Sequence, residues 1–196
     1  MREKQKDVDG NFAKRVTRDF TRTLFKLLQE KSLEDISATE LCKRCSYPRS
    51  TFYNHFDDIY AVMDACWEIV VAEAELDRFQ EIPHENRTAA LFTMLYTYAE
   101  RNEDTLEKLF RHNRPDGAMC RSLNNCMRRN IANMIEQCPS SDNYPIPLAI
   151  VAEHYGNTVW MLLERCFTGK GDLDRETAMQ CLEYLLGTLE KEGAGR

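Results

Sequence analysis

Apolar residues recur at helical spacing along almost the whole chain, and this pattern restricts the possible folds more than any other feature. The first stripe, which is expected to belong to the core, consists of Phe12, Val16, Phe20, Leu24, Leu27 and Leu28. Further stripes run through residues 59–73, 85–101, 103–112, 116–138, 147–167 and 174–191, with Pro or Gly residues at most of the breaks between them. Asp57 or Asp58 is expected to cap the helix that begins at about residue 59. No segment shows the apolar–polar alternation that a half-buried strand requires. The pattern therefore predicts an all-α protein.

Residues 37–56 contain signals for two short helices in close succession. Ser37 and Glu40 have capping-box spacing, so the Ser37 hydroxyl can accept a hydrogen bond from the Glu40 amide while the Glu40 carboxylate reaches back to the Ser37 amide. Pro48 disfavours helical geometry at Tyr47, so the first helix has to end before it, after about eight residues. Because proline fits the first turn of a helix, a second short helix is predicted after the turn.

Two short helices joined by a tight turn behind a longer helix make a helix-turn-helix, which places its second helix in the major groove of DNA. The first residues of that helix meet the base edges. Arg49, Ser50 and Thr51 are therefore candidate base-reading residues, and Arg49 suits a bidentate contact with guanine. Tyr53 and His55 lie further along, where they can reach phosphate oxygens.

The distribution of charge agrees with this reading, although the chain as a whole has a net charge of −6. Residues 1–56 carry twelve Lys or Arg and eight Asp or Glu, so their net charge is +4. Residues 57–196 carry fourteen Lys or Arg and twenty-four Asp or Glu, so their net charge is −10. Local charge is what a phosphate backbone meets. Arg15, Arg18 and Arg22 share a face of the first helix that is either solvated or close to phosphates.

The segment SATELCKRCSYPRSTFYNHF, residues 37–56, resembles the DNA-binding segment of the TetR family of bacterial transcriptional regulators. The core of the resemblance is the run Ser50–Phe56, and the similar region covers residues 12–70, about a third of the chain. Phe52 and Phe56, four residues apart, are expected to face inward from the second helix. Beyond residue 70, the chain resembles the family only in its helices and its length.

The resemblance implies a role for seven residues of this segment. Base reading falls to Arg49, Ser50 and Thr51, and phosphate contact to Ser37, Thr39, Tyr53 and His55. Three positions depart from the family pattern. Ser46 stands where the turn usually has glycine. A serine in a left-handed conformation costs roughly 1 kcal/mol. Pro48 replaces the usual serine cap, and Ile59, after two aspartates, replaces a lysine that often contacts a phosphate.

Charge and helix length both change near residue 57, which predicts a DNA-binding domain at 1–56 and a helical ligand-binding and dimerisation domain at 57–196. The resemblance implies a homodimer formed by the last two helices and a repressor that binds a palindromic operator. The apolar residues of 148–167 surround their helix, and those of 178–189 form a broad stripe, as an interface between subunits requires. The alternative is that both helices are core within one subunit.

The resemblance also implies an effector pocket within residues 85–165. Aromatic and methionine side chains on these helices suit a small, largely apolar ligand that releases the protein from DNA. The candidate lining residues are Phe92, Tyr98, His112, Met119, Asn124, Tyr155 and Trp160. The alternative is that the apolar members of this set are ordinary packed core.

Eight cysteines are spread through the apolar helical patterns, so they are interpreted as buried free thiols. Cys42 and Cys45 have a spacing found in metal sites, but no second ligand pair follows them, and a structural zinc site needs four ligands. We expect no zinc, no other cofactor and no disulfide within the chain. The absence of an apolar run of about 18 residues and of a secretory signal in the charged amino terminus predicts a location in the cytoplasm.

Two other classes of function remain as alternatives. An enzyme is disfavoured because the chain has no phosphate-binding glycine loop, no HExxH and no GxSxG. A helical interaction module that kept this fold and lost DNA binding is the second alternative, which Ile59 and the acidic pair before it favour.

Overall fold

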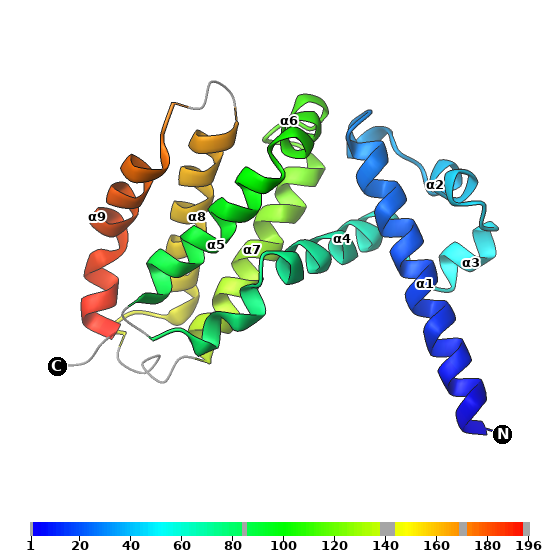
Figure 1. Cartoon of the computed structure of the whole chain (residues 1–196), viewed down its shortest axis with the longest axis horizontal. Coiled ribbons are helices and arrows are strands. Elements are labelled where there is room, and N and C mark those ends of the chain that lie inside the picture. Colours follow the sequence, from blue (N-terminus) through cyan, green and yellow to red (C-terminus); the bar gives the residue numbers. More distant parts are fainter. Residues whose placement is uncertain (1, 84–85, 138–143, 169–171, 194–196) are drawn as a thin grey trace. The chain divides into compact units, whose positions relative to one another are not determined.

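The computed structural model describes residues 2–83, 86–137, 144–168 and 172–193, and it contains helices and no strand within these ranges (Figure 1). The all-α prediction is therefore confirmed. The elements are α1 (Arg2–Leu28), η1 (Leu33–Asp35), α2 (Ala38–Cys45), α3 (Arg49–Tyr53), α4 (Ile59–Glu73), η2 (Leu76–Glu81), α5 (Arg87–Arg101), α6 (Glu103–His112), α7 (Ala118–Glu136), α8 (Leu148–Phe167) and α9 (Arg175–Gly193). Cys138 lies outside the described residues, as does the side chain of Leu189.

The chain forms two compact units. One consists of residues 1–69 and 108–122, and the other of residues 70–107 and 123–196. The functional boundary between residues 56 and 57 stays a prediction, because a compact unit reflects packing and not activity. None of the described helices is long and apolar enough to span a membrane.

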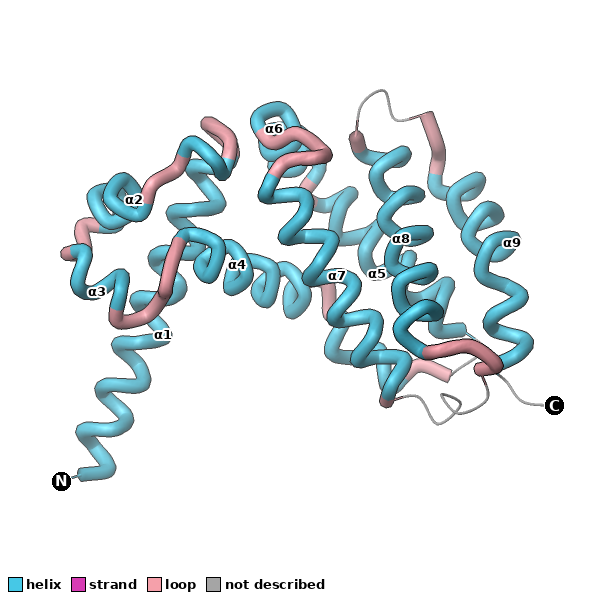
Figure 2. The backbone as a smooth tube through the Cα atoms, turned by 180° about the vertical axis from the view of Figure 1, so that it is seen from behind, coloured by secondary structure: helices cyan, strands magenta, loops and turns pink. Residues whose placement is uncertain are grey.

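In the first unit, the apolar stripe of α1 forms the centre of the core. Val16, Phe20 and Leu24 are fully buried, and α2 and α3 lie beside this part of α1 (Figure 2). Phe12 is 52% exposed, so the prediction that it belongs to the core is wrong. The helix begins as early as Arg2, and its amino-terminal part extends past the elements that pack on it within the unit.

The turn between α6 and α7 interlocks with the end of α1. The buried Asn113 side chain donates hydrogen bonds to the carbonyls of Leu28, at 3.0 Å, and Leu109, at 2.9 Å, and accepts one from the amide of Leu33, at 2.9 Å. The Glu34 carboxylate accepts a hydrogen bond from the amide of Ala118 at 2.7 Å and so caps α7. These contacts satisfy backbone groups that helix ends leave without partners.

The second unit is held by one large apolar cluster. Helices α8 and α9 run side by side in opposite directions, and α5 packs against both (Figures 1 and 2). Phe92, Val151, Val159 and the α9 residues Leu182 and Leu186 are fully buried in this cluster. Within it, the hydroxyl groups of Thr88 and Tyr155 share a hydrogen bond of 2.9 Å. The eight helices predicted after residue 37 are all present with bounds close to those expected, whereas η1 and η2 were not predicted.

Candidate nucleic-acid interface

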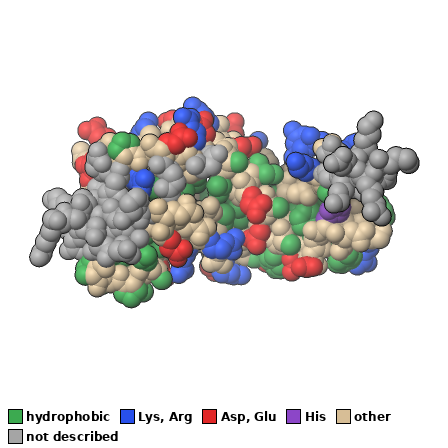
Figure 3. Space-filling model, turned by 90° about the horizontal axis from the view of Figure 1, so that it is seen from below, with side chains coloured by type: hydrophobic (Ala, Val, Ile, Leu, Met, Phe, Trp, Pro, Cys, Tyr) green, Lys and Arg blue, Asp and Glu red, His purple; other side chains and the backbone are tan. Residues whose placement is uncertain are grey.

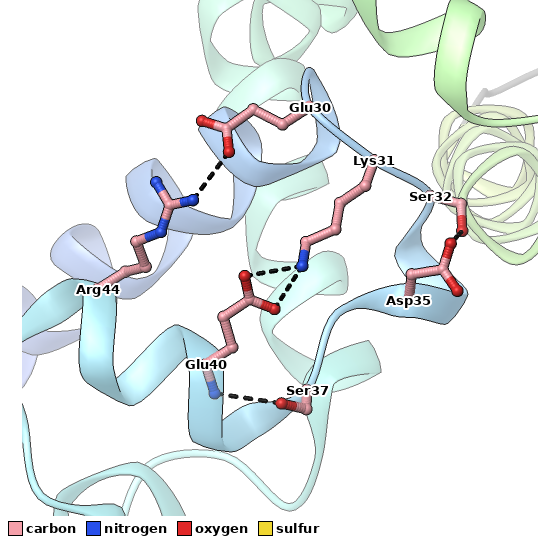
Figure 4. Close-up of polar contacts among 7 residues, drawn as sticks. All are labelled: Glu30, Lys31, Ser32, Asp35, Ser37, Glu40 and Arg44. Carbon is pink, nitrogen blue, oxygen red and sulfur yellow. Dashed lines mark hydrogen bonds and ion pairs between the residues drawn. The ribbon is translucent and has the colours of Figure 1, made fainter.

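A side-chain cap at its start and two ion pairs hold α2 in place (Figure 4). The Ser37 hydroxyl accepts a hydrogen bond from the Glu40 amide at 3.2 Å, as predicted. The Glu40 carboxylate does not complete the capping box. Both of its oxygens instead accept hydrogen bonds from Lys31 Nζ, at 2.7 and 2.6 Å, because the chain before α2 brings this ammonium group within reach. Arg44 pairs with Glu30 at 2.9 Å and joins α2 to the residues just beyond α1.

The turn between α2 and α3 has the geometry that the sequence predicted. Ser46 adopts a left-handed conformation with φ 59° and ψ 33°. Its amide donates to the Lys43 carbonyl at 3.3 Å, and the Tyr47 amide donates to the Cys42 carbonyl at 3.1 Å, which closes α2 with a Schellman motif. Pro48 occupies the cap position of α3 in an extended conformation, without a side-chain cap.

A group of aromatic rings holds α3 against α1. The buried Phe20 ring lies 5.4 Å from the rings of Phe52 and Tyr47 and 5.9 Å from that of Phe56, centroid to centroid. Phe52 is fully buried and Phe56 is 8% exposed, so both face inward as predicted. The Tyr47 hydroxyl donates a hydrogen bond to Asp19 at 3.0 Å, and this bond raises the pKa of Tyr47. The inner face of α3 is therefore fixed by packing against α1.

The seven residues predicted to contact DNA lie at the surface of this unit, and none of them is buried. The exposed residues are Ser37, Thr39, Arg49, Ser50 and Tyr53, and the half-buried residues are Thr51 and His55. The structure places Arg49, Ser50 and Thr51 in the first turn of α3, and Ser37 at the cap of α2. These positions leave the polar groups available to a ligand.

Arg49 and Tyr53 contact each other across one turn of α3. Arg49 Nη2 donates a hydrogen bond to the Tyr53 hydroxyl at 3.3 Å, and the guanidinium carbon lies 5.7 Å from the centroid of the Tyr53 ring. The hydrogen bond to Tyr53 raises the pKa of Arg49. The four-residue spacing of the two side chains on one helix is a signal that sequence analysis could have used.

Other functional contacts of this unit have no local signal in the sequence. The ion pair of Lys31 with Glu40 and the bond from Tyr47 to Asp19 depend on how separate segments come together. At the start of α4, Asp58 accepts a hydrogen bond from the Ala61 amide at 2.9 Å, so the second aspartate is the predicted cap.

Basic side chains accompany the helix-turn-helix. Arg15, Arg18 and Arg22 are all exposed on α1, and the first two lie 3.8 Å from the Asp19 carboxylate. Figure 3 shows Lys and Arg side chains at the surface of the unit that contains α1. Pairs between exposed groups at this distance are weak, so they leave these arginines available to a phosphate.

Burial affects both thiols at the CxxC spacing. Burial raises the pKa of both Cys42 and Cys45 above that of an ordinary thiol, and only a thiolate is a good nucleophile or metal ligand. Among the described residues, no group of three or more His, Cys, Asp or Glu side chains is arranged to hold a metal ion. The expectation of no zinc and no disulfide stays a prediction.

The residues proposed for an effector pocket are divided between the two units. Phe92, Tyr98, Asn124, Tyr155 and Trp160 belong to the second unit, where Phe92 and Tyr155 are buried in the apolar cluster and Tyr98 packs against it. The other two, His112 and Met119, belong to the first unit, and His112 is exposed. Burial raises the pKa of Tyr98 to about 12, with its hydroxyl 3.3 Å from the Glu73 carboxylate. The pocket stays a prediction.

Comparisons with known proteins show similarity in structure without similarity in sequence. No protein-family model matches this chain, and no curated protein matches it either. A crystal structure of a protein from Syntrophomonas wolfei str. Goettingen, assigned to the TetR family of transcriptional regulators, is similar with a TM-score of 0.61. The two share 15% sequence identity over 93% of this chain and 96% of that one.

A second similar structure comes from Pseudomonas aeruginosa PAO1 and is assigned as a transcriptional regulator. Its TM-score is 0.54, with 11% identity over 89% of this chain and 90% of that one. The likeness therefore extends over the helix-turn-helix and the helices that follow it. This chain has the fold of a TetR-family transcriptional regulator.

Proposed function

We propose that this protein is a DNA-binding transcriptional regulator of the TetR family. One observation carries the proposal: a helix-turn-helix whose inner face is held by Phe20, Phe52 and Phe56 presents all seven candidate DNA-contacting side chains at its surface. A helix that enters the major groove needs this division, with apolar groups turned inward and polar groups turned toward the bases. In this proposal, Arg49, Ser50 and Thr51 read bases.

The phosphate contacts then come from Ser37, Thr39, Tyr53 and His55. Such contacts fix the register of a protein on DNA and carry no direct sequence information. The net charge of +4 over residues 1–56 supports this part of the proposal, because it makes the binding unit locally basic in an acidic chain.

We infer that the protein acts as a homodimer through α8 and α9. The buried residues of these helices, such as Val159 and Leu182, belong to the core of one subunit and are no argument for a partner. Other apolar side chains of the same helices are exposed: Ile150 (54%), Met161 (41%), Tyr184 (86%) and Leu185 (38%). Large apolar groups on the outer side of two neighbouring helices are typical of a subunit interface.

A two-fold dimer requires a palindromic operator. Its two recognition helices then enter successive major grooves, roughly 34 Å apart. We further propose that the protein is a repressor, and that a small, largely apolar effector bound in the second unit releases it from DNA. Such a ligand has to bind the DNA-competent and DNA-incompetent states with unequal affinity, since equal affinity shifts no equilibrium.

Selection of bound duplexes from a random pool tests the function. We expect enrichment of a two-fold symmetric sequence, and for the variant Arg49→Ala a selected sequence that has lost the preference at one position per half-site. Failure to enrich any sequence at low salt would favour the alternative of a helical interaction module without DNA binding. The exposed Asp57 and Asp58, before an Ile59 that offers no positive charge to a phosphate, are the features that favour this alternative.

Sedimentation tests the dimer separately. Leu185→Glu and Met161→Glu should convert it to a folded monomer, because each places a charge in the proposed apolar interface. The control Asn133→Glu adds a charge at an exposed polar residue of α7, outside the proposed interface, and should leave the dimer intact. A wild-type protein that stays a stable, well-folded monomer would contradict the dimer.

A further inference from the structure

Arg49 and Tyr53 form a connected pair on the outer side of α3. The hydrogen bond from Arg49 Nη2 to the Tyr53 hydroxyl is 3.3 Å long, and the guanidinium carbon lies 5.7 Å from the ring centroid. The two contacts have different requirements, since the hydroxyl fixes one nitrogen while the ring face attracts the cation as a whole. Together they restrict the long Arg49 side chain before any DNA is present.

The Tyr53 ring is half exposed and also contacts a ring of the core. It packs edge-on against Phe52 with centroids 5.2 Å apart and an angle of 85° between the ring planes. Phe52 is fully buried and packs against Phe20, at the centre of the aromatic group. In the described part of the chain, Arg49 has no ion pair with a carboxylate, so Tyr53 is its one side-chain hydrogen-bond partner there.

The hydrogen-bonding capacity of the two groups allows both to bind DNA without separating. A guanidinium has five N–H donors, and a bidentate contact with guanine uses two of them. The donor given to Tyr53 therefore leaves enough for the base. The Tyr53 oxygen accepts from Arg49 and still has its own hydrogen to donate to a phosphate oxygen.

We propose that Tyr53 is a positioning residue for Arg49, so that its hydroxyl links the phosphate backbone to the guanidinium that reads a base. This inference rests on the proposed function and extends it: Tyr53 is a determinant of sequence preference as well as a phosphate contact. A phosphate contact alone weakens binding to all sequences alike. A side chain that orients a base-reading arginine also changes the preference at the base which that arginine reads.

A double-mutant cycle on Arg49 and Tyr53 tests the proposal. The probes are the duplex selected from a random pool and the duplexes that carry each single base-pair change in one half-site. Wild type, Arg49→Ala, Tyr53→Phe and the double variant are titrated against them by fluorescence anisotropy. Tyr53→Phe retains the ring, so it isolates the hydroxyl.

We expect Arg49→Ala to lower the affinity for the selected duplex and to remove the preference at one position per half-site. Tyr53→Phe should lower the affinity for all duplexes and should also reduce the preference at that same position, by about threefold to tenfold, the effect of ordering one long side chain. In the Arg49→Ala background, Tyr53→Phe should lower all affinities equally. The control Thr39→Val removes an exposed hydroxyl of α2 and should leave every base preference unchanged.

Two results would overturn the inference, and they differ from each other. Equal weakening of every duplex by Tyr53→Phe, with the preference retained, would show that Tyr53 contacts phosphate only, and the proposed function would stand. An unchanged base preference in Arg49→Ala would show that Arg49 does not read a base, and Tyr53 would then have no base-reading side chain to position. Circular dichroism and thermal unfolding of each variant show that the changes in binding do not arise from unfolding.

Discussion

The two units of this protein are stabilised in different ways. Both units have an apolar core, but in the first unit directional contacts also fix the ends of its helices: Ser37 caps α2, Glu34 caps α7 and the Asn113 amide joins two helix ends to η1. In the second unit, α5, α8 and α9 surround an apolar cluster in which the pair of Thr88 and Tyr155 supplies a buried hydrogen bond. Directional contacts hold individual side chains at stated positions, which a DNA-reading surface requires, whereas apolar packing tolerates more variation.

The largest effect should come from the aromatic centre of the first unit. Phe20→Ala should lower the free energy of unfolding by about 3–5 kcal/mol, because the ring is fully buried among three other aromatic rings. Urea denaturation followed by circular dichroism measures this loss. The matched control is Phe12→Ala on the same helix, where the side chain is 52% exposed and the change should be within about 0.5 kcal/mol. Equal losses for both variants would show that the core does not centre on Phe20.

The next effect tests the directional contacts. Asn113→Ala should cost about 1–3 kcal/mol, because it leaves the buried carbonyls of Leu28 and Leu109 and the amide of Leu33 without their partner. The neighbouring His112→Ala, at an exposed position, should change stability little. Asn113→Ala should also lower operator affinity more than a conservative core change in the second unit, such as Val159→Ala. Equal losses of operator affinity in the two variants would contradict the difference between the units.

A smaller effect of opposite sign is expected at the turn of the motif. Ser46→Gly should stabilise the protein by roughly 0.5–1 kcal/mol, because glycine adopts the left-handed conformation without the strain of a side chain. Among the described residues other than glycine, Glu75 is the second with a positive φ, at 57°, and it lies in the second unit. Glu75→Gly should therefore also raise the thermal midpoint. A decrease for Ser46→Gly would show that the serine has a role beyond its backbone conformation.

The smallest effect concerns the ion pairs around α2. Glu40→Gln should cost about 0.5 kcal/mol at low salt and less at high salt, because its carboxylate is 28% exposed and bonded twice to Lys31. Glu30→Gln breaks the pair with Arg44, in which both side chains are 51% exposed, and should have no measurable effect. Salt-dependent thermal unfolding distinguishes the two variants, and the reverse order would contradict this ranking.

The same difference explains what could be predicted from the sequence. Partners three or four residues apart are visible in the sequence, and so the Ser37 cap and the inward Phe52 were correctly predicted. The left-handed Ser46 followed from the resemblance to the TetR family, in which glycine usually occupies this turn position. The predicted hydrogen bond from the Ser37 amide to the Glu40 carboxylate was wrong. That carboxylate binds Lys31 instead, because Lys31 offers a full charge from a neighbouring segment.

Contacts between distant segments were not visible in this way. The bonds of Asn113 to Leu28 and Leu33 join residues 85 and 80 positions apart, and no local pattern marks them. In the second unit, periodicity predicted the helices correctly. It could not separate the buried Leu182 from the exposed Leu185, because both belong to one apolar stripe, and what covers each side of a helix depends on its tertiary neighbours.

The salt dependence of DNA binding tests the central claim most directly. The duplex selected from a random pool and a scrambled duplex of equal length are titrated by fluorescence anisotropy over a series of salt concentrations. We predict tighter binding of the selected duplex at every concentration, and affinities for both duplexes that fall linearly on a logarithmic scale as phosphate contacts exchange with cations. Equal affinity for the two duplexes, or no binding to either at low salt, would contradict the claim that this helix-turn-helix reads DNA.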